Sequence, residues 1–123
     1  MINVKDEIFT ALSRQFDNVS DQYPEDFVKL PAIQYIEEEN KVLEHTFSGK
    51  QVKEDKSQLR YRIDIWDEKS TSPTAVTVDH VISNLGLVRT QCMDNPSANG
   101  FRHKIMRYEG IIDNETKQVY WNK

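Results

Sequence analysis

The chain has 123 residues, and 16 lysines and arginines against 20 aspartates and glutamates give a formal net charge of −4. A domain of this length buries roughly two-thirds of its unfolded surface around one core, so we expect a single domain over residues 1–123. The acidic balance argues against general nucleic-acid affinity, because phosphate binding needs dense positive charge. No apolar run could span a bilayer, and acids in MINVKDEIF replace the apolar segment of a signal peptide, which favours a soluble cytoplasmic product.

Residues 3–16 have the period of an amphipathic helix, with Asn3 placed to cap it. Its apolar side chains fall on one side of a helical wheel, where they could cover a sheet: Val4, Ile8, Phe9, Ala11, Leu12 and Phe16. The following stretch, 17–30, is polar and contains a Tyr23-Pro24 break, which predicts an irregular connection.

After Pro31 a short alternating segment indicates a strand. The consecutive acids at 37–39 favour a solvated strand end before a turn at Asn40, and residues 41–47 could return as a second strand. Residues 47–57 have no apolar periodicity and alternate in charge, so we predict an exposed hairpin tip. Loops of this kind carry function more often than cores do.

The stretch QLRYRIDIW, residues 58–66, alternates strictly and predicts a strand with one face in the core. The apolar face would hold Leu59, Tyr61, Ile63 and Ile65, and the other face Arg60, Arg62, Asp64 and Trp66. We expect the other elements to be organised around this strand.

A second helix is predicted to begin at Ser72, which can cap it, with Pro73 in the first helical position. Its apolar stripe consists of Ala75, Val78, Val81, Ile82 and Leu85. Gly86 is expected to end it, because glycine readily takes the left-handed conformation past a helix end.

Three further strands are predicted, over 87–93, 101–112 and 118–121, with Gly110 as a candidate bulge in the second. The element order is then α-β-β-β-α-β-β-β. We expect an α+β fold, with a mixed, mostly antiparallel sheet of about five to six strands and the two helices packed on one face.

The sequence offers no pattern typical of a catalytic, cofactor or metal site. His45, His80 and His103 lack the short spacing of a ligand set and are expected on the solvated surface. Cys92 is the single cysteine, which excludes an intrachain disulfide, and we expect a buried thiol in a strand. We therefore predict that the protein is not an enzyme.

Two strips combine arginines with aromatic residues, RYR at 60–62 and FRHKIMRY at 101–108. Such strands can stack nucleobases, or they can form a half-buried sheet with arginine stems along apolar surface. Asp64, Glu109 and the overall acidity favour the second interpretation, with a small RNA-binding module as the alternative.

A series of stretches covers nearly the whole chain: an N-terminal helix, LPAIQYIEEEN, a charged hairpin, YRIDIWDEKSTS leading into a helix, and HKIMRYEGIIDNETKQVYWN. This series resembles the tail terminator (tail completion) proteins of long-tailed, non-contractile bacteriophages and their prophages. The most telling pieces are YRIDIW before the second helix and KIMRYEGIID before a short final strand.

The resemblance implies a subunit that forms a homohexameric ring on the completed tail tube, stops its polymerisation and offers a surface to the head-tail connector protein. A monomer before assembly is compatible with this. The resemblance implies no cofactor, no membrane, and DNA only as passing cargo. The expected location is the head-proximal end of the virion tail, after synthesis in the host bacterial cytoplasm.

On this basis we predict contacts to the tail tube or a neighbouring subunit through the charged hairpin, at Phe47, Lys50, Lys53, Glu54, Asp55 and Lys56. Ring contacts or a DNA-conducting channel are predicted at Arg60, Arg62, Asp64 and Arg107. The alternatives within phage assembly are a head-side neck protein, either a stopper or a head-completion protein, and a tail-tube-like subunit.

Overall fold

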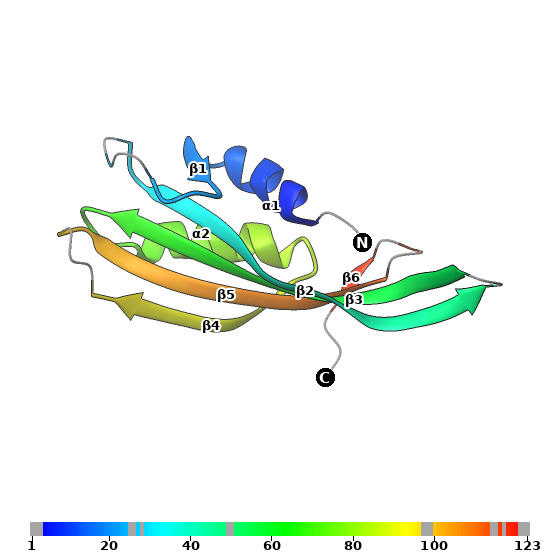
Figure 1. The fold of residues 1–123 in the computed structure, drawn as a ribbon. Coiled ribbons are helices and arrows are strands. Elements are labelled where there is room, and N and C mark those ends of the chain that lie inside the picture. The colour runs from blue at the N-terminus through cyan, green and yellow to red at the C-terminus, as the bar shows by residue number, and fades with distance from the viewer. Residues whose placement is uncertain are drawn as a thin grey trace.

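The structure is a computed structural model that describes residues 4–24, 27, 29–48, 51–96, 100–113, 116 and 118–120, without the side chains of 43–48, 51–55 and 120. In chain order its elements are α1 (Val4–Ser13), β1 (Asn18–Ser20), β2 (Ala32–Ser48), β3 (Gln51–Asp67), α2 (Ser72–Ser83), β4 (Val88–Asn95), β5 (Arg102–Asp113) and β6 (Val119–Tyr120). Figure 1 shows the helices above a long twisted sheet.

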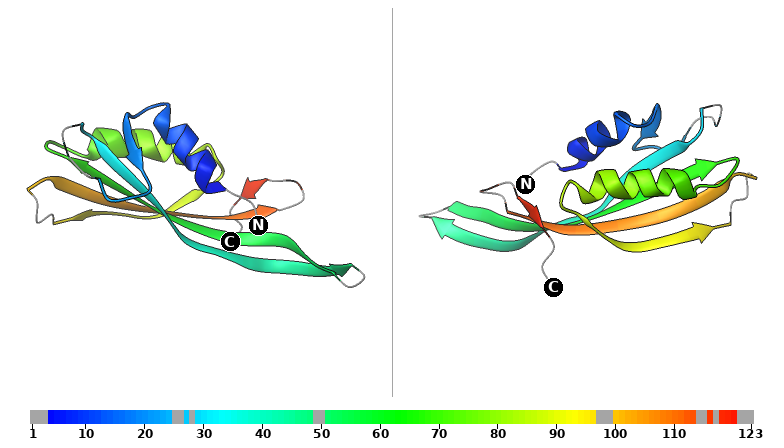
Figure 2. Two further views of the ribbon diagram at one scale, coloured as in Figure 1. Left: turned by 45° about the horizontal axis from the view of Figure 1, so that its top comes forward. Right: turned by 180° about the vertical axis from the view of Figure 1, so that it is seen from behind.

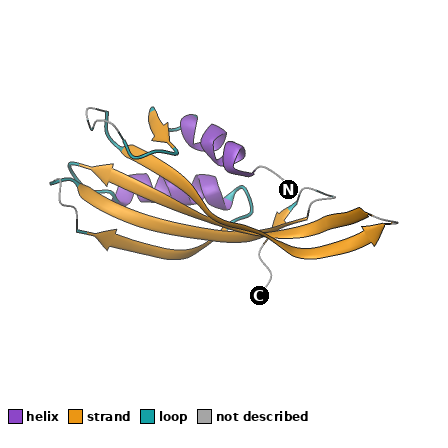
Figure 3. Cartoon of the chain, viewed as in Figure 1, coloured by secondary structure: helices purple, strands orange, loops and turns teal. Residues whose placement is uncertain are grey.

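The strands form one mixed sheet in the order β1-β2-β3-β5-β4, with β6 paired to β5. The pair β1 and β2 is parallel, and the other pairs in the described residues are antiparallel. The predicted α+β class and the order α-β-β-β-α-β-β-β are confirmed (Figure 3). One of the first three strands differs in origin, because β1 forms inside the stretch that the sequence assigned to an irregular connection.

The core lies between the helices and one face of the sheet, as the alternation of residues 58–66 predicted. Leu59, Tyr61, Ile63 and Ile65 of β3 are all fully buried. The helices contribute Val4, Ile8, Leu12, Ala75, Val78 and Ile82 to the same cluster. Phe9 was predicted to join them, but it is 40% exposed and lies beside the ring of Tyr35.

Two buried tyrosines connect the core to its edges by hydrogen bonds. The Tyr61 hydroxyl donates to Glu37 of β2 at 2.9 Å, and the Tyr108 hydroxyl donates to Asp79 of α2 at 2.8 Å. Burial, reinforced by these hydrogen bonds, raises the pKa of both phenols above the ordinary value. Both phenols therefore stay protonated at physiological pH and donate hydrogen bonds to the carboxylates of Glu37 and Asp79.

The predicted turn at Asn40 is wrong, because β2 continues through it to Ser48. Its pairing with β3 runs from Ala32↔Trp66 to Ser48↔Gln51, with register shifts between Glu37 and Glu39 and around Glu44. At these register shifts the alternation of side chains is interrupted although the strand continues, and this interruption suggested a turn in the sequence. The predicted hairpin tip over 47–57 is largely strand, in β2 and β3, and residues 49 and 50 lie outside the described residues.

Smaller differences concern the ends and irregularities of the other elements. Thr71, not Ser72, occupies the N-cap position of α2, with no side-chain cap hydrogen bond. Gly110 is not a bulge, since β3 and β5 pair without interruption from Lys56↔Asp113 to Asp67↔Arg102. The register shift instead lies in β4, between Arg89 and Gln91. Among the described residues, neither helix is long and apolar enough to cross a membrane.

Toward and beyond the end of β5 the strands β2 and β3 continue as a two-stranded arm, which we define as residues 42–57 without 49 and 50. Its base still pairs with β5 at Lys56 and Ser57. Figure 2 shows this arm extending past the helices on the far side of the β2–β3 crossing. At its base, Ser57 is fully buried, whereas Val42 is 50% exposed. A two-stranded hairpin is marginally stable alone in water, so the arm depends on the body or on a partner for its shape.

Gly86 offers a test of how the end of α2 packs on β6. Its φ is 95°, and a Cβ there would overlap the carbonyl oxygen of Val119, whereas a Cβ at Gly100, with a φ of 83°, would meet nothing within 4 Å. Both Gly86→Ala and Gly100→Ala add backbone strain of roughly 1–3 kcal/mol. We expect Gly86→Ala to lower the free energy of unfolding in urea further, by about 1 kcal/mol or more, because backbone must move. Equal losses would contradict this packing.

Candidate interaction surface

The sheet face opposite the helices carries all four residues predicted for ring contacts or a channel, Arg60, Arg62, Asp64 and Arg107. We call it the open face and define it by Gln34, Ile36, Glu38, Arg60, Arg62, Asp64, Gln91, Met93, His103, Ile105, Arg107 and Glu109. The pairing of β3 with its neighbours sets this arrangement, since it places Arg62 opposite Arg107 of β5 and Ile36 of β2. Like charges directly opposite destabilise a sheet, so the two arginines need acids around them.

Arg62 and Asp64 form a bidentate ion pair along one face of β3. The Arg62 Nε donates to Asp64 Oδ1 at 2.7 Å, and its Nη2 donates to Oδ2 at 2.8 Å. The hydrogen bonds that Arg62 donates to Asp64, together with the negative charge of Asp64, raise the pKa of Arg62 against the effect of partial burial. The Asp64 side chain is 3% exposed, so the pair forms in a largely desolvated environment where both charges need their partner.

Arg107 and Arg60 use the acids of β2 instead. The Arg107 Nε donates to Glu38 Oε1 at 3.0 Å, although the two residues are far apart in the chain. Arg60 lies 3.5 Å from Glu38 and 3.7 Å from Glu39, and is opposite Glu109 in the register. Glu38 and Glu39 are thus half-buried ion-pair partners in the middle of a strand, which corrects their prediction as a solvated strand end.

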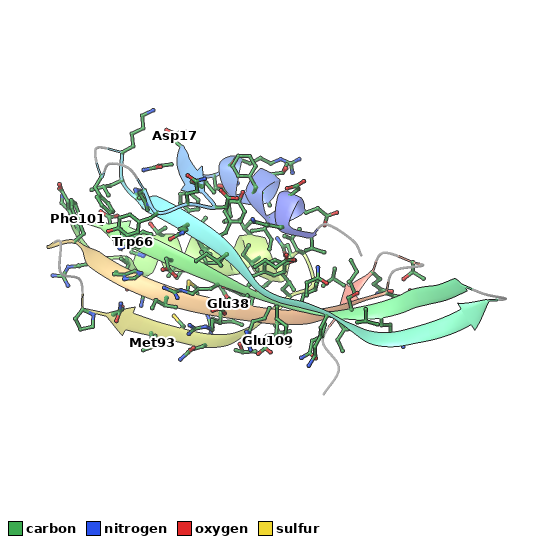
Figure 4. All side chains as sticks on the ribbon, viewed as in Figure 1. Asp17, Glu38, Trp66, Met93, Phe101 and Glu109 are labelled. Atoms are coloured by element: carbon green, nitrogen blue, oxygen red, sulfur yellow. The ribbon has the colours of Figure 1, made fainter. Side chains whose placement is uncertain are left out.

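One end of the open face is covered by an aromatic cluster, defined as Tyr23, Phe27, Trp66, Phe101 and His103. The rings of His103 and Trp66 are stacked with their centroids 4.5 Å apart, and the rings of Phe27 and Phe101 are stacked with theirs 4.6 Å apart. Figure 4 shows Trp66 and Phe101 together where β3 ends and β5 begins. Trp66 is 3% exposed, because the connection before β2 folds over it.

The prediction of His103 as a solvated surface residue is wrong. Its side chain is 9% exposed, and its Nε2 lies 3.2 Å from Asp64 Oδ2, a contact without hydrogen-bond geometry. Its Nδ1 lies 3.3 Å from the Asn95 amide. His103 is buried because the register places it opposite Trp66, whose flat ring accommodates it. His80 is exposed as expected.

Cys92 also differs from its prediction. It lies in a strand, but it is exposed, on the edge strand β4 of the sheet. Across the described part of the chain, no group of three or more His, Cys, Asp or Glu side chains is arranged to hold a metal ion.

The two predicted groups of interaction residues fall in two places. Arg60, Arg62, Asp64 and Arg107 lie together on the open face. Of the hairpin group, Phe47, Lys53, Glu54 and Asp55 lie in the strands of the arm, with side chains outside the described set, and Lys50 lies outside the described residues. Lys56 is half-buried at the base of the arm, opposite Asp113.

Sequence reasoning missed Glu38, Gln91 and His103 as parts of the open face, and Asn95 as a neighbour of His103. Their contacts join strands that are distant in the chain, so no local spacing indicates them. The one usable signal is the run of acids at 37–39, whose charge matches that of the arginines on the neighbouring strands.

A scan of the chain against protein-family models and a search of curated proteins both find no match. The functional inference for this chain therefore depends on the geometry of the open face and the arm, together with the resemblance stated above.

The burial of Asp64 leads to a prediction about stability. Asp64→Asn keeps the volume but removes the charge that partners Arg62, and we expect the free energy of unfolding to fall by roughly 1–3 kcal/mol. The matched control is Asp94→Asn, whose carboxylate contacts Lys104 at 2.9 Å but is 80% exposed. The control should change stability by less than about 0.5 kcal/mol. Similar losses in urea unfolding for both variants would contradict this account of the open face.

Proposed function

We propose that this chain is a structural subunit of phage assembly, which caps the completed tail tube as a ring, stops tube polymerisation and provides the surface for head-tail joining. Its partners are then further copies of itself, the tail tube protein and the head-tail connector protein. DNA passes through the ring as cargo, and no cofactor takes part. The proposal extends the resemblance of YRIDIW and KIMRYEGIID to tail terminator proteins.

The observation that carries the proposal is the two-stranded arm. It continues β2 and β3 beyond the last residue of β5, away from the helices, and Val42 at its base is half-exposed. An isolated two-stranded ribbon gains little stability in water, so its length is best explained by contact with another protein. A ring subunit that must reach a tube or a neighbour needs a projecting element of this kind.

The charge arrangement of the open face supports the same proposal. Its arginines are matched by acids of the same chain, namely Asp64 for Arg62 and Glu38 for Arg107. Such a surface offers alternating charges to a protein partner, which favours a specific orientation. It also lacks the excess positive charge that would hold passing DNA by counterion release.

The RNA-binding alternative has less support. Stacking of bases needs accessible rings, but Trp66 is 3% exposed and His103 is covered by it. The arginines that would contact phosphates are engaged with carboxylates. A head-side neck protein would share the arm and the open face, and binding to purified tails rather than to DNA-filled heads distinguishes it from a terminator.

Shortening the arm tests the proposal. Residues 43–56 are replaced by Asn-Gly, which joins the paired residues Val42 and Ser57 by a two-residue hairpin turn. The body should fold as before, because the buried residues of β3 from Ser57 onward remain. We expect the variant to fail in completing tails, measured as infectious particles formed when it replaces the natural protein in assembly extracts.

The matched control keeps the arm and changes an exposed side chain of α2 instead. Val76→Ser alters a side chain of α2 that is 72% exposed and should support normal tail completion. Normal tail joining by the arm-shortened variant, with its fold verified by circular dichroism, would contradict the proposed role of the arm.

A further inference from the structure

Two edges of the sheet carry backbone without a strand partner in the described part of the chain. β4 pairs with β5 on one side, and its side chains from Val88 to Asp94 are exposed. On the opposite edge, β1 pairs with β2 at Ala32–Gln34, and from Tyr35 to Val42 the described residues provide no strand on the outer side. Such edges are ready to pair with another chain.

The β4 edge is only partly protected, by the charged residues Arg89 and Asp94 and by the register shift between Arg89 and Gln91. It contains no lysine or proline between Val88 and Asn95, and it exposes Val88 by 40% and Met93 by 42%. Soluble proteins usually protect an edge with charges, proline or a very short strand. An eight-residue edge strand with exposed apolar side chains is therefore a candidate interface.

The strand directions make the two edges complementary. Along β2, β3, β5 and β4, each strand is antiparallel to its neighbour. β4 therefore runs opposite to β2, and a second copy placed beside the first in the same orientation presents its β2 edge antiparallel to β4. The sheet could continue from one copy into the next without a change of pattern.

The irregularities of the two edges also match. β2 has one extra residue, Glu38, between positions paired to β3, and β4 has one extra residue, Thr90, between positions paired to β5. Placing Met93 opposite Ile36 sets Arg89 opposite Asn40. The first of these pairs joins two side chains of the open face, and the second joins two side chains of the helix-covered face.

A register shifted by one residue would set open-face side chains against helix-side ones. A shift by two that sets Met93 opposite Glu38 places Gln91 and Cys92 against side chains of the other face. The opposite shift, with Met93 opposite Gln34, keeps the faces of these residues matched, but β1 already pairs with the outer side of β2 there. The register with Met93 opposite Ile36 keeps the faces matched on both sides of Thr90 and Glu38 and places Met93 beyond the residues of β2 that pair with β1.

We propose that β4 of one copy pairs antiparallel with β2 of the next copy, with Met93 opposite Ile36 and Arg89 opposite Asn40. The pairing buries the exposed Met93 against an aliphatic side chain and brings Cys92 opposite Glu37. Because the two edges differ, the contact is head-to-tail, which generates rings when the rotation between copies closes. This inference rests on the proposed ring-forming function and names the surfaces that build the ring.

Disulfide trapping tests the register. In a Cys92→Ser background, which removes the single native thiol, the double variant Arg89→Cys/Asn40→Cys places two thiols at directly opposite positions. Opposite residues in an antiparallel pair have Cα atoms about 4.5–5.5 Å apart, within the range that a disulfide spans. The control is Arg89→Cys/Lys69→Cys, with Lys69 exposed in the loop between β3 and α2 and part of neither edge strand.

Both variants lose the contact of Arg89 with Asp79, so any effect of that loss is common to them. Under oxidising conditions we expect the Asn40 variant to form a ladder of head-to-tail oligomers on non-reducing gels. Thiols held at a contact react at millimolar effective concentration, so the ladder should form on the order of a hundredfold faster than in the control.

Equal rates in the two variants would overturn the inference, and so would dimers formed equally fast by Arg89→Cys alone, which indicate a symmetric contact between β4 strands. Tail capping by the natural protein is measured separately. If tails are capped but no ladder forms, the edge contact is contradicted and the proposed function stands. If a ladder forms but tails are not capped, the proposed function is contradicted and the edge contact stands.

Discussion

The alternation of side chains along β3 is the constraint on which the rest of the structure depends. Its buried face, from Leu59 to Ile65, is the surface that α1 and α2 cover. The same period of two forces Arg60, Arg62 and Asp64 onto the other face, where no helix provides counter-charges. A slip of one residue would exchange the two sets, so the core and the charged surface are fixed together.

The acids of the open face compensate the repulsion between arginines that this register places opposite each other. Arg62 and Arg107 lie opposite each other, and each is neutralised by an acid of another position, Asp64 or Glu38. The low exposure of Asp64 makes the loss of its partner costly, because it would leave a charge with little water around it. The charges of the open face are thus matched within the chain, and the arm and the strand edges are the parts available for partners.

Periodicity in the sequence was sufficient for both helices, for β3 and for the fold class. It was insufficient for β2, because the extra residue Glu38 and the shifts around Glu44 break the alternation while the strand continues. The burial of His103 and the exposure of Cys92 depend on the order of strands in the sheet. The sequence pattern does not fix that order, so these two environments were predicted wrongly. The four residues predicted around Arg62 do meet on one face, because three of them belong to one strand and Arg107 follows from its register.

The central claim is that copies of this chain form a ring that caps tail tubes. The most direct test is negative-stain microscopy of the purified protein, alone and mixed with tail tubes of the same phage or prophage, together with its mass by light scattering. The account predicts rings of about six subunits on tube ends and tubes that stop growing. Tubes that remain uncapped and continue to lengthen in an excess of the protein would contradict it.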